Sequence, residues 1–326
     1  MIETNVEKVY QSIDNMTKIL QEQLNEPYLD SLIIAMNGIL YGEPEKELDE
    51  LTKQKLKRTF KTVQAFTDND IQRAFQLAIL KGMKDTIQPQ HVMTPDAIAL
   101  LIGYLAQKLT ESNEHIRVFD PVCGTGNLIL KVIDQIKKPY TAFANEIDPT
   151  LLRLAVIHTN IQKTEIEYFH QDALRPLLLD PVDLVVADLP IGYYPDDERA
   201  STFQLKSDKG YSYAHHLIIE QSINYTKEGG YLIFLIPEFL FNSDQSDQLH
   251  TFFHQQVHII GVFQLPSTVF KAEQHRRSIL IVQKQGENTA PVKQPLLVKL
   301  PSLNNLRAME DILGKINAWF SEHLNK

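Results

Sequence analysis

A glycine turn between two apolar segments is the first feature of this sequence that can bind a ligand. Gly124 and Gly126 follow the short apolar run that ends at Asp120, and a helical pattern, residues 128–138, begins directly after them. Glycine lacks a Cβ atom, so a ligand can approach the backbone, and the free N–H groups at the start of the helix can bind it. Such turns also occur for local reasons, so the turn alone leaves both interpretations open.

Two further acids, each at the end of a later apolar run, extend this candidate site. Glu146 lies about 20 residues beyond the glycines, where a carboxylate can hydrogen-bond the two hydroxyls of a ribose. Asp172 ends the next run, and a carboxylate there can accept a hydrogen bond from the amino group of an adenine ring. An acid before a helix can also simply cap it, but capping explains three acids at successive positions less well.

The elements that must position these residues alternate between β-rich and helical segments. This alternation predicts a doubly wound α/β sheet with mostly parallel strands. Because only a short loop, residues 266–277, separates the last two strands, we expect that pair to be a hairpin with one antiparallel strand. A C-terminal helix is predicted from Asn304 to Leu324. The seven predicted strands are Arg117–Asp120, Tyr140–Ile147, Glu165–Phe169, Asp183–Asp188, Tyr231–Ile236, Ile259–Leu265 and Ser278–Lys284.

The N-terminal segment has a different pattern, typical of amphipathic helices. From Val6 to about Gly82, apolar residues recur at intervals of three and four with polar residues between them. We therefore predict an N-terminal helical domain over residues 1–86 and an α/β domain over residues 87–326. The segment Gln88-Pro89-Gln90 is the expected linker.

The composition predicts a folded protein of the cytosol. With 326 residues and 43% hydrophobic content the chain can bury a substantial core, and its single cysteine, Cys123, excludes an intrachain disulfide. The first residues lack the pattern of a signal peptide, and the longest apolar stretch, residues 231–241, is far shorter than the roughly 20 residues that span a bilayer. The net charge of −9 argues against coating nucleic acid through overall charge and leaves a local basic groove open.

Four segments of the α/β region carry a resemblance to a known family: Thr94-Pro95, Asp120-Pro121-Val122-Cys123-Gly124-Thr125-Gly126, Asn145-Glu146-Ile147-Asp148-Pro149 and Asp172-Ala173-Leu174. They are similar to the cofactor motifs of adenine-N6 DNA methyltransferases, above all the methylation subunits of type I restriction systems. A later stretch, residues 265–270 followed by Arg277-Ser278-Ile279-Leu280, is similar to a late segment of the same family. The resemblance implies a class I, Rossmann-like methyltransferase sheet that carries S-adenosylmethionine. It also implies that Thr94 and the glycine loop meet the methionine end, Glu146 the ribose and Asp172 the adenine. The other residues of the expected cofactor site are Pro95, Asp120, Pro121, Cys123, Thr125, Asn127, Ile147 and Ala173.

The fourth strand leads into Asp188-Leu189-Pro190-Ile191, where the family carries its catalytic tetrapeptide of Asp, Asn or Ser, two prolines and an aromatic residue. The resemblance implies that Asp188 and the backbone carbonyl of Leu189 accept the hydrogens of an exocyclic amine, in a turn stiffened by Pro190. Leu189 stands in place of the first proline, and any residue retains that carbonyl.

Ile191 stands in place of the aromatic residue that stacks on a flipped base. Two tyrosines lie just beyond it, Tyr193 and Tyr194. They can supply the missing stacking face, or they can pack the turn against the sheet. We expect substrate contacts from Ile191, Tyr193 and Tyr194, and the two interpretations of the tyrosines stay open.

Three other features are better explained by packing or solvation than by chemistry. Cys123 has no histidine or second cysteine near it in sequence, so we expect a packed side chain and no nucleophile. The pair His215-His216 lacks metal-ligand spacing to another His or Cys, and no metal site is predicted. The basic run at residues 53–58 is interpreted as the solvated face of a helix.

We therefore predict an S-adenosylmethionine-dependent methyltransferase that acts on adenine in DNA. The methyl group would pass directly from the sulfonium of the cofactor to the adenine nitrogen. Two alternatives stay open: a methyltransferase of RNA or of a protein amide, and a non-catalytic S-adenosylmethionine-binding protein that works through its helical domain. No base-reading domain is evident, whereas type I systems place specificity on another subunit. The expected partners are therefore nucleic acid as substrate and a separate specificity subunit or a second copy of the chain.

Overall fold

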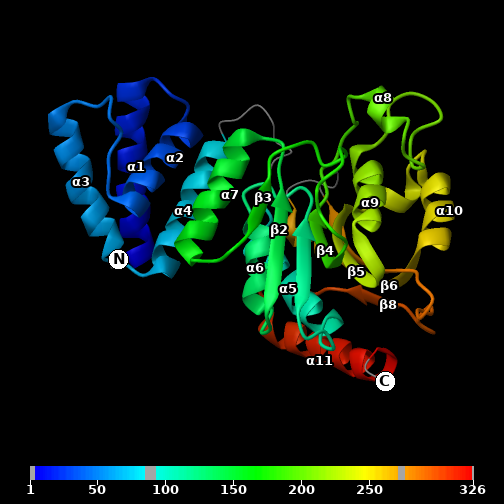
Figure 1. The fold of residues 1–326 in the computed structure, drawn as a ribbon. Helices are drawn as coiled ribbons and strands as arrows, with labels where there is room; N and C mark the ends of the chain where they lie inside the picture. Colours follow the sequence, from blue (N-terminus) through cyan, green and yellow to red (C-terminus); the bar gives the residue numbers. More distant parts are fainter. Residues whose placement is uncertain (1–3, 85–92, 271–275, 325–326) are drawn as a thin grey trace. The chain divides into compact units, whose positions relative to one another are not determined.

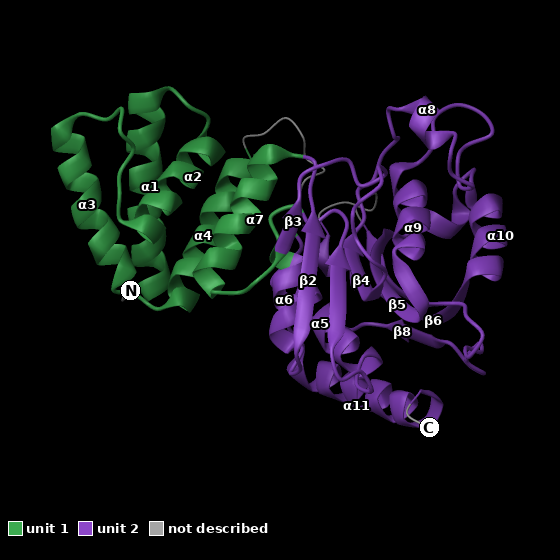
Figure 2. Ribbon diagram, in the orientation of Figure 1, with its two compact units in different colours: residues 1–93, 124–127, 148–166 green, residues 94–123, 128–147, 167–326 purple. Residues whose placement is uncertain are grey.

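In a computed structural model, which describes residues 4–84, 93–270 and 276–324, the chain divides into two units (Figures 1 and 2). Unit 1 comprises residues 1–93, 124–127 and 148–166, and unit 2 comprises residues 94–123, 128–147 and 167–326. The predicted linker, residues 88–90, and the predicted domain boundary between residues 86 and 87 lie outside the described residues.

Unit 1 is helical, and its helices begin and end at residues that satisfy the terminal backbone groups. Thr4 and Glu7 form a capping box before the first helix, and Asp49 accepts N–H bonds from Leu51 and Thr52 before the third. The second helix ends at Gly42, whose positive φ of 78° suits glycine. The helices are α1 (Asn5–Leu24), α2 (Tyr28–Tyr41), α3 (Glu50–Gln64), α4 (Asp68–Lys84) and α7 (Pro149–Gln162).

The helix α7 joins unit 1 although 64 residues of sequence separate it from α4 (Figure 2). Asp148 caps its first turn and Pro149 stands at its first position, as expected for a helix start. Its apolar face, with Leu154 and Ile157, belongs to the same core as Ile13 and the other buried residues of α1 to α4. The sequence predicted the helical N-terminal region, but periodicity does not say which partner a helix packs against.

A buried carboxylate connects three helices of unit 1. Asp14, in α1, accepts a hydrogen bond from the Tyr28 hydroxyl at 2.8 Å and forms ion pairs with Lys18, at 2.8 Å, and with Lys81 of α4. Burial acts to raise the pKa of Asp14, but the hydrogen bonds from Lys18, Lys81 and Tyr28 outweigh it, so the net pKa is lowered.

We expect Asp14→Asn to lower the free energy of unfolding by about 1–3 kcal/mol at neutral pH. Because the folded-state pKa is depressed, the contribution of Asp14 is present above its unfolded pKa of about 3.9 and is lost as the pH falls below it. Urea unfolding followed by circular dichroism at several pH values measures this. The exposed pair Asp68–Lys163 provides the control, since Asp68→Asn should change stability by less than about 1 kcal/mol. A loss for Asp14→Asn that persists unchanged in acid would contradict the assignment.

Unit 2 is built on a sheet in which, among the described residues, eight strands pair in the order β3-β2-β1-β4-β5-β7-β6-β8. All neighbouring strands are parallel except that β7 runs antiparallel to both β5 and β6. The order reverses direction between β1 and β4, and ligands of doubly wound sheets bind at the carboxyl ends of the strands at such a point. The strands are β1 (Ile116–Asp120), β2 (Tyr140–Asn145), β3 (Glu167–Phe169), β4 (Val182–Asp188), β5 (Thr226–Pro237), β6 (Val257–Gln264), β7 (Arg277–Lys284) and β8 (Leu296–Lys299).

The doubly wound, mostly parallel α/β fold and the antiparallel pairing of β6 with β7 confirm the sequence prediction, but the count of seven strands was wrong. The missed strand, β8, has four residues and pairs with β6 in parallel at the sheet edge. Its exposure alternates between intermediate and exposed, so it has no buried apolar run to mark it in the sequence. A strand this short depends on its tertiary partner more than on its own propensity.

Helices α9 and α10 bury one face of the sheet (Figure 1). Leu217 and Ile219 of α9 and Leu249 of α10 share a core with Val185 of β4 and Phe234 of β5. No helix in the described ranges is both long enough and apolar enough to cross a membrane. The remaining elements are α5 (Asp96–Leu109), α6 (Asn127–Gln135), α8 (Asp197–Ala200), η1 (Leu240–Asn242), η2 (Ser267–Val269) and α11 (Leu306–His323), beside α9 (Ala214–Asn224) and α10 (Ser246–Gln256).

Candidate functional site

A buried carboxyl group and a half-buried one stand at the carboxyl ends of β1 and β4, where the strand order reverses. Asp120 ends β1 and is 1% exposed, and its carboxylate accepts the Val122 N–H at 3.1 Å. Burial raises the pKa of Asp120 well above its usual value, and the nearby charges of Glu146 and Asp188 raise it further. Glu146 and Asp188 therefore both lie close enough to Asp120 to influence it.

Asn145 joins the ends of three neighbouring strands. Its Nδ2 donates to the carbonyl of Pro121, after β1, and to the carbonyl of Gln171, after β3, both at 3.0 Å. The Cys123 N–H donates in return to the Asn145 carbonyl at 2.9 Å. These bonds hold Pro121 and Cys123 against the end of β2. Asn145 stands in one of the segments that resemble the family, but nothing in the sequence predicted this bridging role.

Glu146 follows β2 and is largely buried, whereas the next side chain, Ile147, is 60% exposed. The Glu146 carboxylate accepts the Ile147 N–H at 2.9 Å, and the Glu146 N–H donates to Phe169 in β3 at 3.1 Å. A carboxylate fixed beside an exposed apolar side chain can hydrogen-bond sugar hydroxyls while the apolar group contacts a ring.

Asp172 is held by two donors on its two oxygens. The Leu174 N–H donates to one at 2.9 Å, and the hydroxyl of Tyr194 donates to the other. Tyr194 is only 8% exposed, and burial, followed by the Asp172 hydrogen bond and charge, raises its pKa. Tyr194 therefore packs against the candidate adenine site and has no open ring face for stacking. Ala173 is buried beside it.

Asp188, at the end of β4, is surrounded by donors. Thr94 Oγ1 donates to Asp188 Oδ2 at 2.8 Å. Arg277 Nη1 donates to Asp188 Oδ1 at 2.7 Å and also to the Leu189 carbonyl at 2.8 Å. Burial raises the pKa of Asp188, while Arg277 and Thr94 act to lower it. Thr94, expected at the cofactor, thus touches the catalytic candidate, and Pro95 beside it precedes the first turn of α5.

The turn after Asp188 places one tyrosine at the surface. Gly192 takes φ 151°, a conformation that favours glycine, and its carbonyl accepts the Ala214 N–H at 2.9 Å. Tyr193 pairs with Tyr213 in an isolated antiparallel bridge, and their rings stack with centroids 5.0 Å apart. The Tyr211 ring also lies near Tyr193, with centroids 6.1 Å apart, and Tyr193 is still 58% exposed, so part of its ring is open to a further ring. Leu189 is fully buried, and Pro190 and Ile191 are half-buried.

The side chains that we expected to be structural are packed or solvated. Cys123 is buried, and burial raises its thiol pKa, with Asp120 and Glu146 adding to the shift. His215 and His216 are fully buried in α9. Burial, then the charges of His216 and Arg277, lower the pKa of His215 to about 3, so it is neutral at physiological pH.

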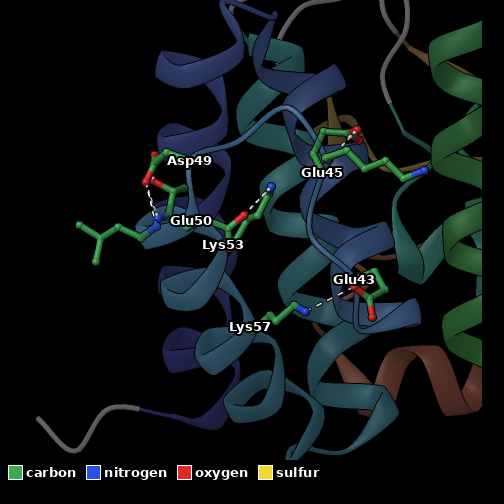
Figure 3. A network of polar contacts seen from close by, with 9 residues as sticks. Glu43, Glu45, Asp49, Glu50, Lys53 and Lys57 are labelled. Atoms are coloured by element: carbon green, nitrogen blue, oxygen red, sulfur yellow. Dashed lines mark hydrogen bonds and ion pairs between the residues drawn. The ribbon is translucent and has the colours of Figure 1, made fainter.

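The basic run of α3 is solvated and is balanced by acids of its own surface. Lys53 pairs with Glu50 at 3.0 Å, and Lys57 pairs with Glu43 at 3.4 Å (Figure 3). Lys55 and Arg58 are exposed. The prediction of a solvated helix face is confirmed.

The glycine-loop residues 124–127 are grouped with unit 1, where two side chains that the sequence analysis missed contact them. His158, in α7, lies 3.1 Å from the Thr125 carbonyl through Nδ1, and Gln76 Nε2, in α4, donates to Asn127 Oδ1 at 2.8 Å. All four residues are buried. No motif marked Gln76 or His158, since each lies inside an amphipathic helix pattern.

Comparisons with known proteins identify both regions of the chain. Residues 7–83 match the family described as the YtxK N-terminal helical domain, and residues 83–311 match the family described as N-6 DNA Methylase. The chain is 43% identical to the Bacillus subtilis (strain 168) protein YtxK, over 99% of both chains.

Solved structures show the same architecture. A Listeria monocytogenes protein, described as a class I S-adenosylmethionine-dependent methyltransferase, is 38% identical, with a TM-score of 0.89 over 97% of this chain and 99% of the other. The methyltransferase subunit of a type I restriction-modification system from Streptococcus thermophilus is 15% identical, with a TM-score of 0.65 over 94% of this chain and 74% of that subunit. At this identity the second likeness concerns the fold alone.

Proposed function

The chain belongs to the N-6 DNA methylase family and is an S-adenosylmethionine-dependent N-methyltransferase, and from that premise we propose that it methylates the exocyclic amino group of adenine in DNA. Asp188 and the Leu189 carbonyl orient the amine, and Tyr193 supplies the aromatic face that Ile191 lacks. Asp188, Leu189 and Tyr193 all belong to unit 2.

The observation that carries this proposal is the way Asp188 Oδ1 and the Leu189 carbonyl converge on one nitrogen. Arg277 Nη1 lies 2.7 Å from the first oxygen and 2.8 Å from the second. A guanidinium Nη and the N6 of adenine are both planar NH2 groups conjugated to a ring or a π system, and each has two hydrogens to donate. The two oxygens are thus spaced to bind such a group.

Holding both hydrogens has a chemical consequence for the amine. The nitrogen lone pair of a conjugated amine is a poor nucleophile, and two acceptors draw electron density toward the nitrogen as positive charge develops there. Since burial raises the pKa of Asp188, this carboxylate is a stronger base than an exposed aspartate and can hold the proton that the nitrogen loses.

The residues present also fit the cofactor. S-adenosylmethionine supplies the electrophilic methyl group on its sulfonium. Glu146 presents a fixed carboxylate for the ribose hydroxyls, Ile147 an exposed apolar surface for the adenine ring, and Asp172 an acceptor for its amino group. The resemblance assigns Gly124 to the methionine end of the cofactor, and this residue, with φ 55°, has no side chain to exclude a ligand.

The proposal is tested by incubating the protein with S-adenosylmethionine labelled on the methyl group and with separate pools of DNA, RNA and protein. We expect label in the DNA pool, on N6-methyladenine after digestion. Label in RNA or in protein would show that the acceptor is RNA or protein and not DNA. Label in no pool, despite cofactor binding, would favour the non-catalytic binding protein.

Tyr193→Ala is expected to weaken binding of an adenine-containing single strand by about 1–3 kcal/mol, the contribution of one base stacked on an aromatic ring. Binding is measured with a cofactor analogue present, and 2-aminopurine at the target position reports unstacking by its fluorescence. Tyr41→Ala is the control, because Tyr41 is also an exposed tyrosine, at 68%, and lies in α2. If Tyr193→Ala and the wild type bind the strand with equal affinity, Tyr193 is not part of the acceptor site.

A further inference from the structure

Arg277 occupies the position that the acceptor amine must take. Its backbone is fixed at the start of β7, opposite Pro237 of β5, and its side chain is 17% exposed. Through one nitrogen it donates to both oxygens that the proposed function assigns to the amine, Asp188 Oδ1 and the Leu189 carbonyl. The remaining Asp188 oxygen accepts from Thr94.

A second NH2 group cannot share this position with Arg277. To make the same two hydrogen bonds in the same geometry, its nitrogen would have to lie where Nη1 already lies. The bond from Arg277 to Asp188 is charge-assisted, whereas a neutral amine makes weaker bonds. An acceptor therefore displaces Arg277 only if it gains binding energy elsewhere.

We propose that Arg277 is a built-in competitor for the amine position and thereby a specificity-determining residue of the transferase. This inference rests on the proposed function. Small amines, which have only the NH2 group to offer, fail to displace the guanidinium, and a free nucleoside adds only the stacking of its base. A strand whose base also stacks on Tyr193 and whose neighbours add contacts gains enough to displace it.

The site itself is tested first, without nucleic acid. Arg277→Met removes the charge and the donors but keeps a long flexible side chain. Methylguanidinium, added as its chloride, should raise the melting temperature of Arg277→Met and leave unchanged both the wild type and the double variant Arg277→Met/Asp188→Ala. Equal shifts in all three proteins, or no shift in Arg277→Met, would overturn the inference.

The competition is tested next, with an adenine-containing single-stranded oligonucleotide in the presence of a cofactor analogue. Arg277→Met should bind the strand about ten- to a hundredfold more tightly than the wild type, because the competing charge-assisted bonds are gone. Arg277→Lys, which keeps the positive charge, should stay within about threefold of the wild type. If a folded Arg277→Met binds the strand no more tightly than the wild type, Arg277 does not compete with the acceptor amine.

A measurement on the wild type covers the case in which Arg277→Met fails to fold. The guanidinium signal of Arg277, assigned by its loss in Arg277→Lys, should move in the nuclear magnetic resonance spectrum when the strand saturates the protein. An unmoved signal at saturation would overturn the inference. Strand binding by none of the proteins, together with the methylguanidinium shift, would contradict DNA as substrate while supporting Arg277 as the occupant of the amine position.

Discussion

Asp188→Ala is expected to lower methyl transfer by about 100- to 1000-fold, the usual loss when one preorganised hydrogen-bonding group is removed from a transition state. The affinity for S-adenosylmethionine should change little, because the carboxylate contacts Thr94 and Arg277 and the acceptor amine is its proposed ligand. Transfer is measured with the labelled cofactor on the substrate that the pool experiment identifies, and affinity by titration calorimetry.

The controls for this variant separate chemistry from stability. Asp188→Ala leaves the Arg277 charge without its carboxylate, which costs stability. The double variant Asp188→Ala/Arg277→Met removes that unpaired charge, so it should melt closer to the wild type while staying inactive. Asp188→Asn keeps one acceptor oxygen, and the family resemblance admits Asn at this position, so this variant should retain more transfer than Asp188→Ala. Normal turnover by Asp188→Ala would show that Asp188 is not catalytic.

The sequence placed the acids of the candidate site at one edge of the sheet because parallel strands bring their carboxyl ends together there. Asp120, Glu146 and Asp188 follow separate apolar runs, and the structure shows them close enough for their charges to raise the pKa of Asp120. Arg277 stands in a segment similar to a late segment of the family, but nothing in the sequence assigned it a role or placed it beside Asp188. It starts β7, far along the chain, and reaches Asp188 only because β7 pairs with β5 in antiparallel register. The two tyrosines likewise differ in exposure, 58% and 8%, through contacts with Tyr213 and Asp172 that spacing does not encode.

The fold shows the same division between local and tertiary information. Strong periodic patterns predicted the helical region that holds α1 to α4, because burial of one helix face constrains residue type at regular intervals. Continuous apolar runs predicted the central strands, because both faces of these strands are buried. The edge strand β8 has neither constraint. The packing of α7 with α2 and α4 depends on side chains from distant segments, such as the edge contact between Phe75 and His158 with ring centroids 5.1 Å apart. Periodicity identifies the helix but not this partner.

S-adenosylmethionine at about 100 times its dissociation constant is expected to stabilise the wild type by roughly 2.7 kcal/mol, and Gly124→Val is expected to abolish that gain. Gly124 has φ 55°, and no described atom lies within 4 Å of the position where a Cβ would stand. A Cβ at that position therefore meets no described atom beyond its chain neighbours, but it occupies space that the resemblance assigns to the cofactor. Thermal melts of both proteins, with and without ligand, measure the difference.

Gly124→Val both obstructs the proposed cofactor space and strains the backbone, and a second variant separates these two effects. A β-branched residue is strained at positive φ, so Gly124→Val should also melt at a lower temperature without ligand. Asparagine tolerates this conformation, as Asn25 shows with φ 54°, so Gly124→Asn adds a side chain with little backbone strain. We expect Gly124→Asn to melt near the wild type without ligand and to gain little when ligand is added. An unshifted midpoint for the wild type at millimolar ligand would contradict cofactor binding. The full shift in both variants would place the cofactor elsewhere, because a side chain at Gly124 would then not obstruct it.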